Sequence, residues 1–209
     1  HAKIIEALEL QEIDILVGTQ MLAKGLDFRH VSLVGVMNAD NLLNFPDFRA
    51  HERSFQLLQQ VAGRAGRTKK RGKVIIQTYN PYHQILEQVS STDYIAMFKE
   101  QLQDRWQYHY PPYFRLIKIT LKHKDYQKVD AGIIWLSKAL QNVFREHVLG
   151  PSEPAVSRIR NQYIKNVMIK IPPKQSLGKT KQEIDKIKNT FQAIADFRPI
   201  RFIIDVDAY

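Results

Sequence analysis

The chain has 209 residues, enough for one or two ordinary domains, and its 44% hydrophobic content excludes a wholly disordered protein. A formal net charge of +10 favours a polyanionic partner such as nucleic acid. Cysteine is absent, which excludes disulfides and cysteine zinc sites in this sequence, and there is neither a membrane-length apolar run nor a signal peptide, so a cytoplasmic protein is the default. Because the chain opens at His1 on residues that suit the end of a helix, we expect a piece of a longer protein.

Short apolar runs in the first part of the chain predict a parallel sheet. They occupy residues 14–19, 31–37 and 73–79, and uninterrupted runs of this kind suit strands buried on both faces. Helical patterns lie at residues 48–67 and 83–89. Strands that alternate with helices predict a parallel α/β layer, in which ligands bind beyond the carboxyl ends of the strands.

The loop at residues 18–28 follows the first predicted strand and offers several kinds of polar group. Thr19, Gln20 and Lys24 could hold a sugar–phosphate backbone, and Asp27 could accept hydrogen bonds from ribose hydroxyls. An ordinary connection from strand to helix uses similar residues, so this loop alone leaves both interpretations open. The next loop ends at Asp47, which we interpret as the N-cap of the helix that follows.

That helix ends in two arginines and two glycines, Arg64, Arg67, Gly63 and Gly66. Each glycine in a helix costs about 1 kcal/mol relative to alanine, so two of them make sense if a large ligand approaches the backbone. With Gln60, the arginines lie opposite the apolar face of the helix, and a guanidinium binds phosphate through two parallel hydrogen bonds. The alternative is a solvated basic helix end, stabilised by the helix dipole.

These segments resemble the second motor lobe of superfamily-two helicases. Q-x-x-G-R-x-G-R at residues 60–67 is similar to motif six, and T-Q-x-x-x-K-G-x-D at residues 19–27 is similar to motif five. Three further segments resemble the primosomal protein N′ family of replication-restart helicases more specifically. They are NAD at 38–40, PDFRAHER at 46–53 and VIIQTYNP at 74–81. The similarity is dense from Asp14 to Pro81 and thinner up to Tyr209.

The resemblance implies a RecA-like lobe with three groups of site residues. They are catalytic arginine fingers at the γ-phosphate of ATP (Arg64, Arg67), other residues at the nucleotide (Gln60, Gly63, Gly25, Asp27), and residues along a single DNA strand (Thr19, Gln20, Lys24). The phosphate loop GxxxxGK[ST] and an Asp-Glu magnesium box are not found in this sequence. Residues 177–180, LGKT, do not replace the loop, because its first glycine falls on Pro173.

ATP and Mg²⁺ are therefore expected to bind mainly to another lobe, and the chain alone is expected to be inactive. The resemblance also implies zinc in the full-length protein, although none in this piece. The scattered histidines have no metal-ligand spacing and are interpreted as surface or packing residues.

The second part of the chain predicts a small α+β domain. Residues 92–107 read as a helix whose stripe of Tyr94, Ile95, Phe98, Leu102 and Trp106 we interpret as packing between domains. Prolines 111 and 112 then forbid a helix. We expect a helicase lobe at 1–91, a connecting helix and linker at 92–112, and an α+β domain at 113–209. Its strands and helices, at 116–122, 125–148, 155–159, 167–171, 180–195 and 200–206, follow the order of a split βαβ fold.

A basic hairpin in this domain is a candidate DNA site. It carries Arg158, Arg160, Tyr163 and Lys165, and basic residues interleaved with an aromatic are typical of nucleic-acid contacts. In the resembled family, a small C-terminal domain contributes to binding branched DNA. The alternative is an edge strand whose charges prevent unwanted pairing.

The most specific hypothesis is an ATP-dependent DNA helicase of replication restart and primosome assembly, unwinding 3′ to 5′ by family implication. Its implied partners are forked and single-stranded DNA, single-strand DNA-binding protein and other primosome proteins. The alternatives are a non-catalytic nucleic-acid-binding module and another superfamily-two helicase, acting in fork remodelling or on RNA.

Overall fold

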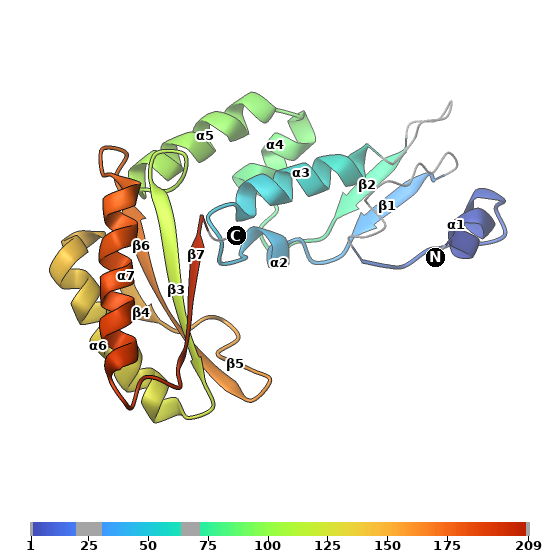
Figure 1. Ribbon diagram of the computed structural model, residues 1–209. Coiled ribbons are helices and arrows are strands. Elements are labelled where there is room, and N and C mark those ends of the chain that lie inside the picture. Colours follow the sequence, from blue (N-terminus) through green and yellow to red (C-terminus); the bar gives the residue numbers. More distant parts are fainter. Residues whose placement is uncertain (1, 20–30, 64–71, 208–209) are drawn as a thin grey trace. The chain divides into compact units, whose positions relative to one another are not determined.

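The computed structural model describes residues 2–19, 31–63 and 72–207, and its chain divides into two compact units between Gln103 and Asp104. Figure 1 shows the helices and strands in order along the chain. The two units are taken one at a time below.

The N-terminal unit combines helices with a short parallel sheet. Its elements are α1 (Ala2–Glu9), β1 (Leu33–Val36), α2 (Asp40–Leu43), α3 (Ala50–Ala62), β2 (Lys73–Ile76), α4 (Gln84–Ser91) and the start of α5 (Tyr94–Gln107), which continues into the second unit. β1 and β2 pair in parallel, from Leu33 opposite Lys73 to Val36 opposite Ile76, which confirms the predicted parallel α/β layer. Both strands alternate exposed and half-buried residues, so the expectation of strands buried on both faces is wrong.

One apolar cluster holds this unit together. Its buried members are Ala39, Leu43, Phe55, Leu58, Ile85, Leu86, Val89 and Met97. Phe55 and Leu58, on the predicted apolar face of α3, are 4% and 1% exposed. Their burial fixes the rotation of α3 about its axis and leaves Gln60 on its exposed side.

Two predictions in this unit are wrong. Residues 15–17 form no strand, and Ile15 and Val17 are 80% and 82% exposed, because a strand needs a hydrogen-bonded neighbour and no described segment pairs with them. α3 begins at Ala50, with Arg49 at its cap, so Asp47 is not the N-cap. The Asp47 carboxylate instead accepts hydrogen bonds from the Arg49 backbone N–H at 2.8 Å and the Arg53 guanidinium at 2.9 Å, and thus stabilises the approach to the helix.

Helix α5 turns a face other than the predicted stripe toward the core of the N-terminal unit. Tyr94 and Phe98 are 52% and 44% exposed and stack on each other with ring centroids 6.0 Å apart. The structure instead buries Met97 and Gln101, which lie one helical turn apart on another face. Met97 belongs to the apolar cluster of the N-terminal unit, and this contact determines which face of the helix turns inward.

The C-terminal unit is a two-layer α+β domain. Its elements are β3 (Arg115–His123), α6 (Tyr126–Phe144), a 3₁₀ turn η2 (Arg145–His147), β4 (Val148–Ser152), β5 (Arg158–Ile159), β6 (Gln162–Ile171), α7 (Leu177–Ala193) and β7 (Arg201–Val206). The sheet order is β4-β6-β3-β7, with β5 paired to β6. β6 runs antiparallel to both β3 and β4, so β3 and β4 are parallel with β6 inserted between them. This is the predicted split βαβ arrangement, and the predicted fold class is confirmed.

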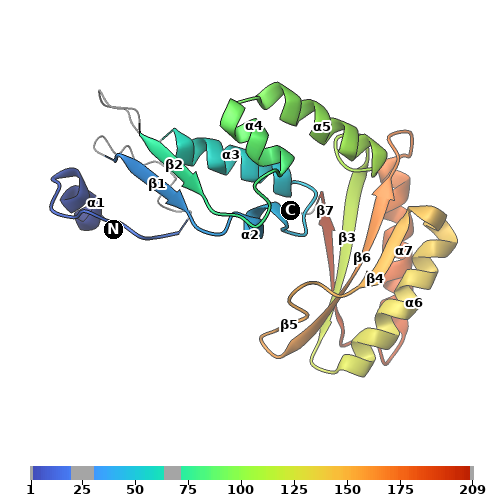
Figure 2. The same ribbon diagram turned by 180° about the vertical axis from the view of Figure 1, so that it is seen from behind.

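Alternate residues of the central strands form the core under the two helices. Ile117, Ile119 and Leu121 of β3 and Val167 and Ile169 of β6 are at most 1% exposed. Figures 1 and 2, which view the molecule from opposite sides, both show α6 and α7 on one face of this sheet and the β5–β6 hairpin projecting on the other side.

The hairpin boundaries differ from the prediction, and one strand was missed. Its turn is Arg160-Asn161, with φ of +47° and +61°, so β6 begins at Gln162 rather than at the predicted residue 167, and Tyr163 lies in the strand. Two residues with positive φ make the tight turn that matches the twist of paired strands. β4 was missed because Gly150 and Pro151 interrupt its pattern, and it exists through pairing with β6.

Gly132 in α6 is predicted to tolerate no branched side chain. A Cβ at this position would lie 2.9 Å from Ile200 Cδ1 and 3.2 Å from Phe191 Cζ. We expect Gly132→Val to lower the free energy of unfolding by about 1–3 kcal/mol in urea denaturation, because overpacking displaces these core side chains. Gly178→Ala is the control, since its Cβ meets only Ser176 Oγ at 3.8 Å. Equal stability of the two variants would contradict the prediction.

Candidate nucleotide and DNA sites

The end of α3 presents the first part of the candidate nucleotide site. Gln60 is exposed, and Gly63 caps the helix with right-handed backbone angles, its N–H donating to the Gln59 carbonyl at 2.9 Å. A Cβ at Gly63 would lie 3.5 Å from Gln59 O, an ordinary contact, so the described part of the chain supplies no steric need for a glycine here. A ligand that approaches the backbone remains a physical reason for it.

Several predicted site residues lie outside the described residues. They are Gln20, Lys24, Gly25, Asp27, Arg64 and Arg67. Thr19 lies at the edge of the described part and is exposed to solvent. For the motif-six segment, the structure thus places Gln60 and Gly63 together at the end of α3.

Asp40 connects the segments that leave β1 and β2, which the sequence did not predict. Its carboxylate accepts a hydrogen bond from Thr78 Oγ1 at 2.8 Å and another from the Tyr79 backbone N–H at 3.1 Å. The Thr78 hydroxyl oxygen in turn accepts from the Asn80 N–H at 3.0 Å. These bonds hold together the carboxyl ends of the parallel strands, where ligands of such sheets bind. Asp40 and Thr78 belong to the NAD and VIIQTYNP segments quoted above, which are the only sequence signal that could have indicated this contact.

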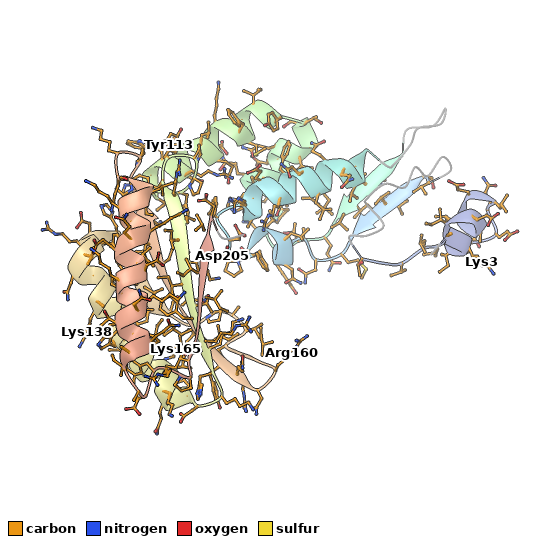
Figure 3. The ribbon with its side chains drawn as sticks, viewed as in Figure 1. Lys3, Tyr113, Lys138, Arg160, Lys165 and Asp205 are labelled. Carbon is orange, nitrogen blue, oxygen red and sulfur yellow. The ribbon has the colours of Figure 1, made fainter. Side chains whose placement is uncertain are left out.

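The β5–β6 hairpin presents a braced basic surface. The Arg158 guanidinium donates to Asn161 Oδ1 in the turn and lies 4.9 Å from the centre of the Tyr163 ring. Tyr163 in turn makes an edge contact with Tyr126 of α6, with ring centroids 5.4 Å apart. Arg160 is exposed at the turn, on the side of the sheet away from α6 and α7 (Figure 3). The structure therefore brings Arg158, Arg160 and Tyr163 together as predicted.

Lys165 has a different environment, because its side chain lies under the first turns of α6 and is only 12% exposed. The ammonium forms ion pairs with Asp130 and with Glu153, the latter at 3.3 Å, and donates to the Tyr126 hydroxyl at 3.2 Å. Burial lowers the pKa of Lys165, but hydrogen bonds to Asp130, Tyr126 and Glu153 outweigh it and raise the pKa overall. Three partners engage the three N–H groups, so Lys165 fastens the base of the hairpin to α6 and to the segment after β4.

Residues 177–180, the LGKT segment, form the first turn of α7, which begins three residues before the predicted helix. Ser176 caps α7, its side chain accepting from the Lys179 N–H, and Thr180 is 1% exposed with its hydroxyl donating to the Ser176 carbonyl at 3.0 Å.

Within the described residues, no group of three or more His, Cys, Asp or Glu side chains is placed to hold a metal ion. None of the helices in that part of the chain has the length and apolar character that crossing a membrane requires.

The Lys165 network is predicted to stabilise the domain in a pH-dependent manner. Lys165→Met should lower the free energy of unfolding by about 1–3 kcal/mol near neutral pH, because it leaves two carboxylates without their cation. Since the folded-state pKa is raised, the stabilisation is complete below the ordinary lysine pKa of 10.5 and is lost as the pH rises above it.

The measurement is urea denaturation of both proteins from neutral to alkaline pH, where the difference between them should shrink. Lys186→Met is the control, because the Lys186–Glu183 pair is exposed and should contribute less than about 0.5 kcal/mol. A difference that grows with pH would contradict the assigned pKa direction.

Comparison with known proteins agrees with this arrangement. Residues 107–209 match the primosomal protein N C-terminal domain, and residues 1–69 match the helicase conserved C-terminal domain. The replication restart protein PriA of Bacillus subtilis is 37% identical over 211 residues, covering 100% of this chain and 26% of the relative. PriA of Synechocystis is 38% identical over 174 residues, covering 82% and 21%, and PriA of Haemophilus influenzae is 35% identical over 205 residues, covering 97% and 27%.

The chain thus spans about a quarter of the length of these relatives. The helicase match ends at residue 69 and the primosomal match begins at residue 107, and the similarity to the Bacillus subtilis relative extends over the whole chain. The chain belongs to the family of the replication restart protein PriA, whose helicase C-terminal and primosomal C-terminal domains it carries.

Proposed function

We propose that this chain is the second-lobe and C-terminal part of an ATP-dependent DNA helicase that unwinds 3′ to 5′ and supports primosome assembly at stalled forks. The observation that carries the proposal is the pair of domain matches, a helicase domain followed by a primosomal C-terminal domain. The complete activity needs a first lobe with a phosphate loop, so the chain alone hydrolyses no ATP. Work on the chromosome implies a cytoplasmic location.

On the nucleotide side, we assign Arg64 and Arg67 to the γ-phosphate of ATP. Both follow directly on α3, whose rotation is fixed by buried Phe55 and Leu58. Phosphoryl transfer develops negative charge on the transferred group, and a positioned arginine can supply about 10³–10⁵ in rate. Gln60, Gly63, Gly25 and Asp27 are assigned to the same nucleotide. ATP and Mg²⁺ would be held mainly by the first lobe, and zinc by another part of the full-length protein.

On the DNA side, we assign Thr19, Gln20 and Lys24 to the tracked single strand, and the hairpin to forked or branched DNA. Arg158 and Arg160 supply the charge of the hairpin, and Tyr163 supplies an aromatic surface that Arg158 already covers in part. Lys165 acts at this site through its ion pairs, as a residue that positions the hairpin. Single-strand DNA-binding protein and other primosome proteins are the proposed protein partners.

The catalytic assignment predicts a selective loss of ATP turnover. In the full-length protein, Arg64→Ala or Arg67→Ala should lower DNA-stimulated ATP hydrolysis by about 10³-fold or more and leave DNA affinity largely unchanged. Steady-state ATPase assays and fluorescence anisotropy measure the two quantities. Lys99→Ala, which removes one exposed charge from α5, should retain wild-type turnover. Wild-type ATP turnover in both arginine variants would contradict the catalytic assignment.

The DNA assignment predicts that charge reversal at the hairpin weakens fork binding. In the full-length protein, Arg158→Glu combined with Arg160→Glu should reduce fork-DNA affinity at moderate salt by about tenfold or more, and the salt dependence should become shallower as phosphate contacts are lost. Lys138→Glu combined with Lys181→Glu on α6 and α7 makes the same charge change on the helical layer. If both double variants bind forks with wild-type affinity, the hairpin is not part of the DNA site.

A further inference from the structure

The last turn of α3 leads directly to Arg64 and Arg67 in the sequence. All fully buried residues of this helix lie before that turn, and the last of them is Leu58. Residues 59–62 are half-buried or exposed, and apolar packing has no preferred direction, so packing alone holds this end of the helix loosely. Helix ends also fray, because their last carbonyl groups lack partners within the helix. A directional contact in this turn would therefore decide how precisely the arginines are held.

Gln59 makes such a contact with α4, which lies beside α3 (Figure 1). The side-chain Nε2 of Gln59 donates a hydrogen bond to the backbone carbonyl of Val89 at 2.7 Å, and Val89 lies in the last turn of α4. The backbone carbonyl of Gln59 accepts a hydrogen bond from the Gly63 N–H at 2.9 Å. Gln59 thus connects the residue that directly precedes Arg64 with a second helix.

The end of α4 is a firm anchor for this contact. Val89 is 6% exposed and belongs to the apolar cluster of the N-terminal unit. One residue earlier, Gln88 Nε2 donates to the Glu100 carboxylate of α5 at 2.6 Å. The Thr92 N–H donates to the Val89 carbonyl at 3.2 Å and so closes the end of the helix. Gln59 therefore ties α3 to a helix end that packing and other hydrogen bonds fix independently.

The Val89 carbonyl keeps a hydrogen bond even when the Gln59 amide is removed. A carbonyl oxygen has two lone pairs, and the Thr92 N–H engages one of them. Removing the Gln59 amide therefore leaves no buried acceptor without a partner, which is the usual large cost of deleting a hydrogen bond. The contact thus adds little to folding, whereas it fixes the end of the helix from which the arginines continue.

We propose that Gln59 is a positioning residue for ATP hydrolysis, which holds Arg64 and Arg67 at the transferred phosphoryl group by tying the last turn of α3 to α4. The proposal rests on the helicase function proposed above and adds a residue to the same nucleotide site. Charged groups stabilise a transition state only when they are already in place, and a displacement of about 1 Å can cost about 10²-fold in rate. Gln59 acts through the two arginines and not on the nucleotide itself.

The test replaces the amide of Gln59 with an apolar group of similar length. Gln59→Met in the full-length protein removes the N–H donor and keeps the reach of the side chain. Gln56→Met is the matched control, because Gln56 is an exposed glutamine of the same helix whose amide donates to Glu52 within α3 at 3.2 Å. Steady-state assays with DNA give kcat and KM for ATP. Fluorescence titrations give the affinity for ADP and for ADP with aluminium fluoride, which mimics the phosphoryl group during transfer.

We expect Gln59→Met to lower kcat about tenfold while KM for ATP and the affinity for DNA change less than about twofold. The variant should bind ADP like the wild type and the fluoride complex about tenfold more weakly, because only the fluoride complex presents the phosphoryl charge to the arginines. Gln56→Met should behave like the wild type, and both melting temperatures should stay near the wild-type value. Wild-type turnover in Gln59→Met would overturn the proposal. A lower melting temperature with equal losses of affinity for ADP and its fluoride complex would show a structural role and also overturn it.

A background without the two arginines separates this proposal from the helicase assignment. In a protein that carries Arg64→Ala and Arg67→Ala, adding Gln59→Met should cause no further loss of affinity for the fluoride complex, because residues that act through one another are not additive. A further loss of about tenfold in that background would overturn the positioning role while the helicase function stands. Wild-type affinity of the arginine double variant for the fluoride complex would instead overturn the assignment of the arginines, and the role of Gln59 with it.

Discussion

The pairing of β3 with β6 is the constraint on which the C-terminal unit depends. It runs from Arg115 opposite Ile171 to His123 opposite Tyr163, along the whole of β3. Because side chains alternate between the two faces of a strand, this one register sends the isoleucines and valines under α6 and α7 and the lysines of β3 to the other face. It also brings Lys165 beneath α6, where Asp130 and Tyr126 meet it.

The same register determines what the hairpin can do. The start of β6 is one arm of the hairpin, with Tyr163 opposite both Arg158 of β5 and His123 of β3, and it is held by Tyr163 against Tyr126 and by Lys165 against Asp130. Because these contacts order the basic turn before a ligand binds, little conformational entropy of the loop is lost on binding. Charge for an external ligand, on Arg158 and Arg160, and charge for internal support, on Lys165, thus come from the same hairpin.

The N-terminal unit follows a comparable principle with a different sheet. Parallel pairing of β1 and β2 brings their carboxyl ends together, and Asp40 connects the segments that follow them through Thr78 and Tyr79. The apolar cluster below sets the rotation of α3 and so determines that Gln60 faces solvent. Motif residues close together in the chain depend on contacts between segments that are far apart in it.

The sequence by itself determined the local features of this protein. Residues 60–67 and the NAD and VIIQTYNP segments indicated the family, and hydrophobic periodicity predicted α6, α7, β3 and β7, although it did not predict β4. These signals are local, since a motif or a periodic face is written in consecutive residues.

The tertiary structure alone decided which residues meet. Residues 15–17 form no strand because no described segment pairs with them, and β4 forms despite Gly150 and Pro151 because it pairs with β6. On α5, packing against the apolar cluster buries Met97. It also separated the basic residues that the sequence had grouped, burying Lys165 among carboxylates while leaving Arg160 exposed. Composition gives the number of charges, but only strand register and helix packing determine whether each charge faces a partner in the protein or the solvent.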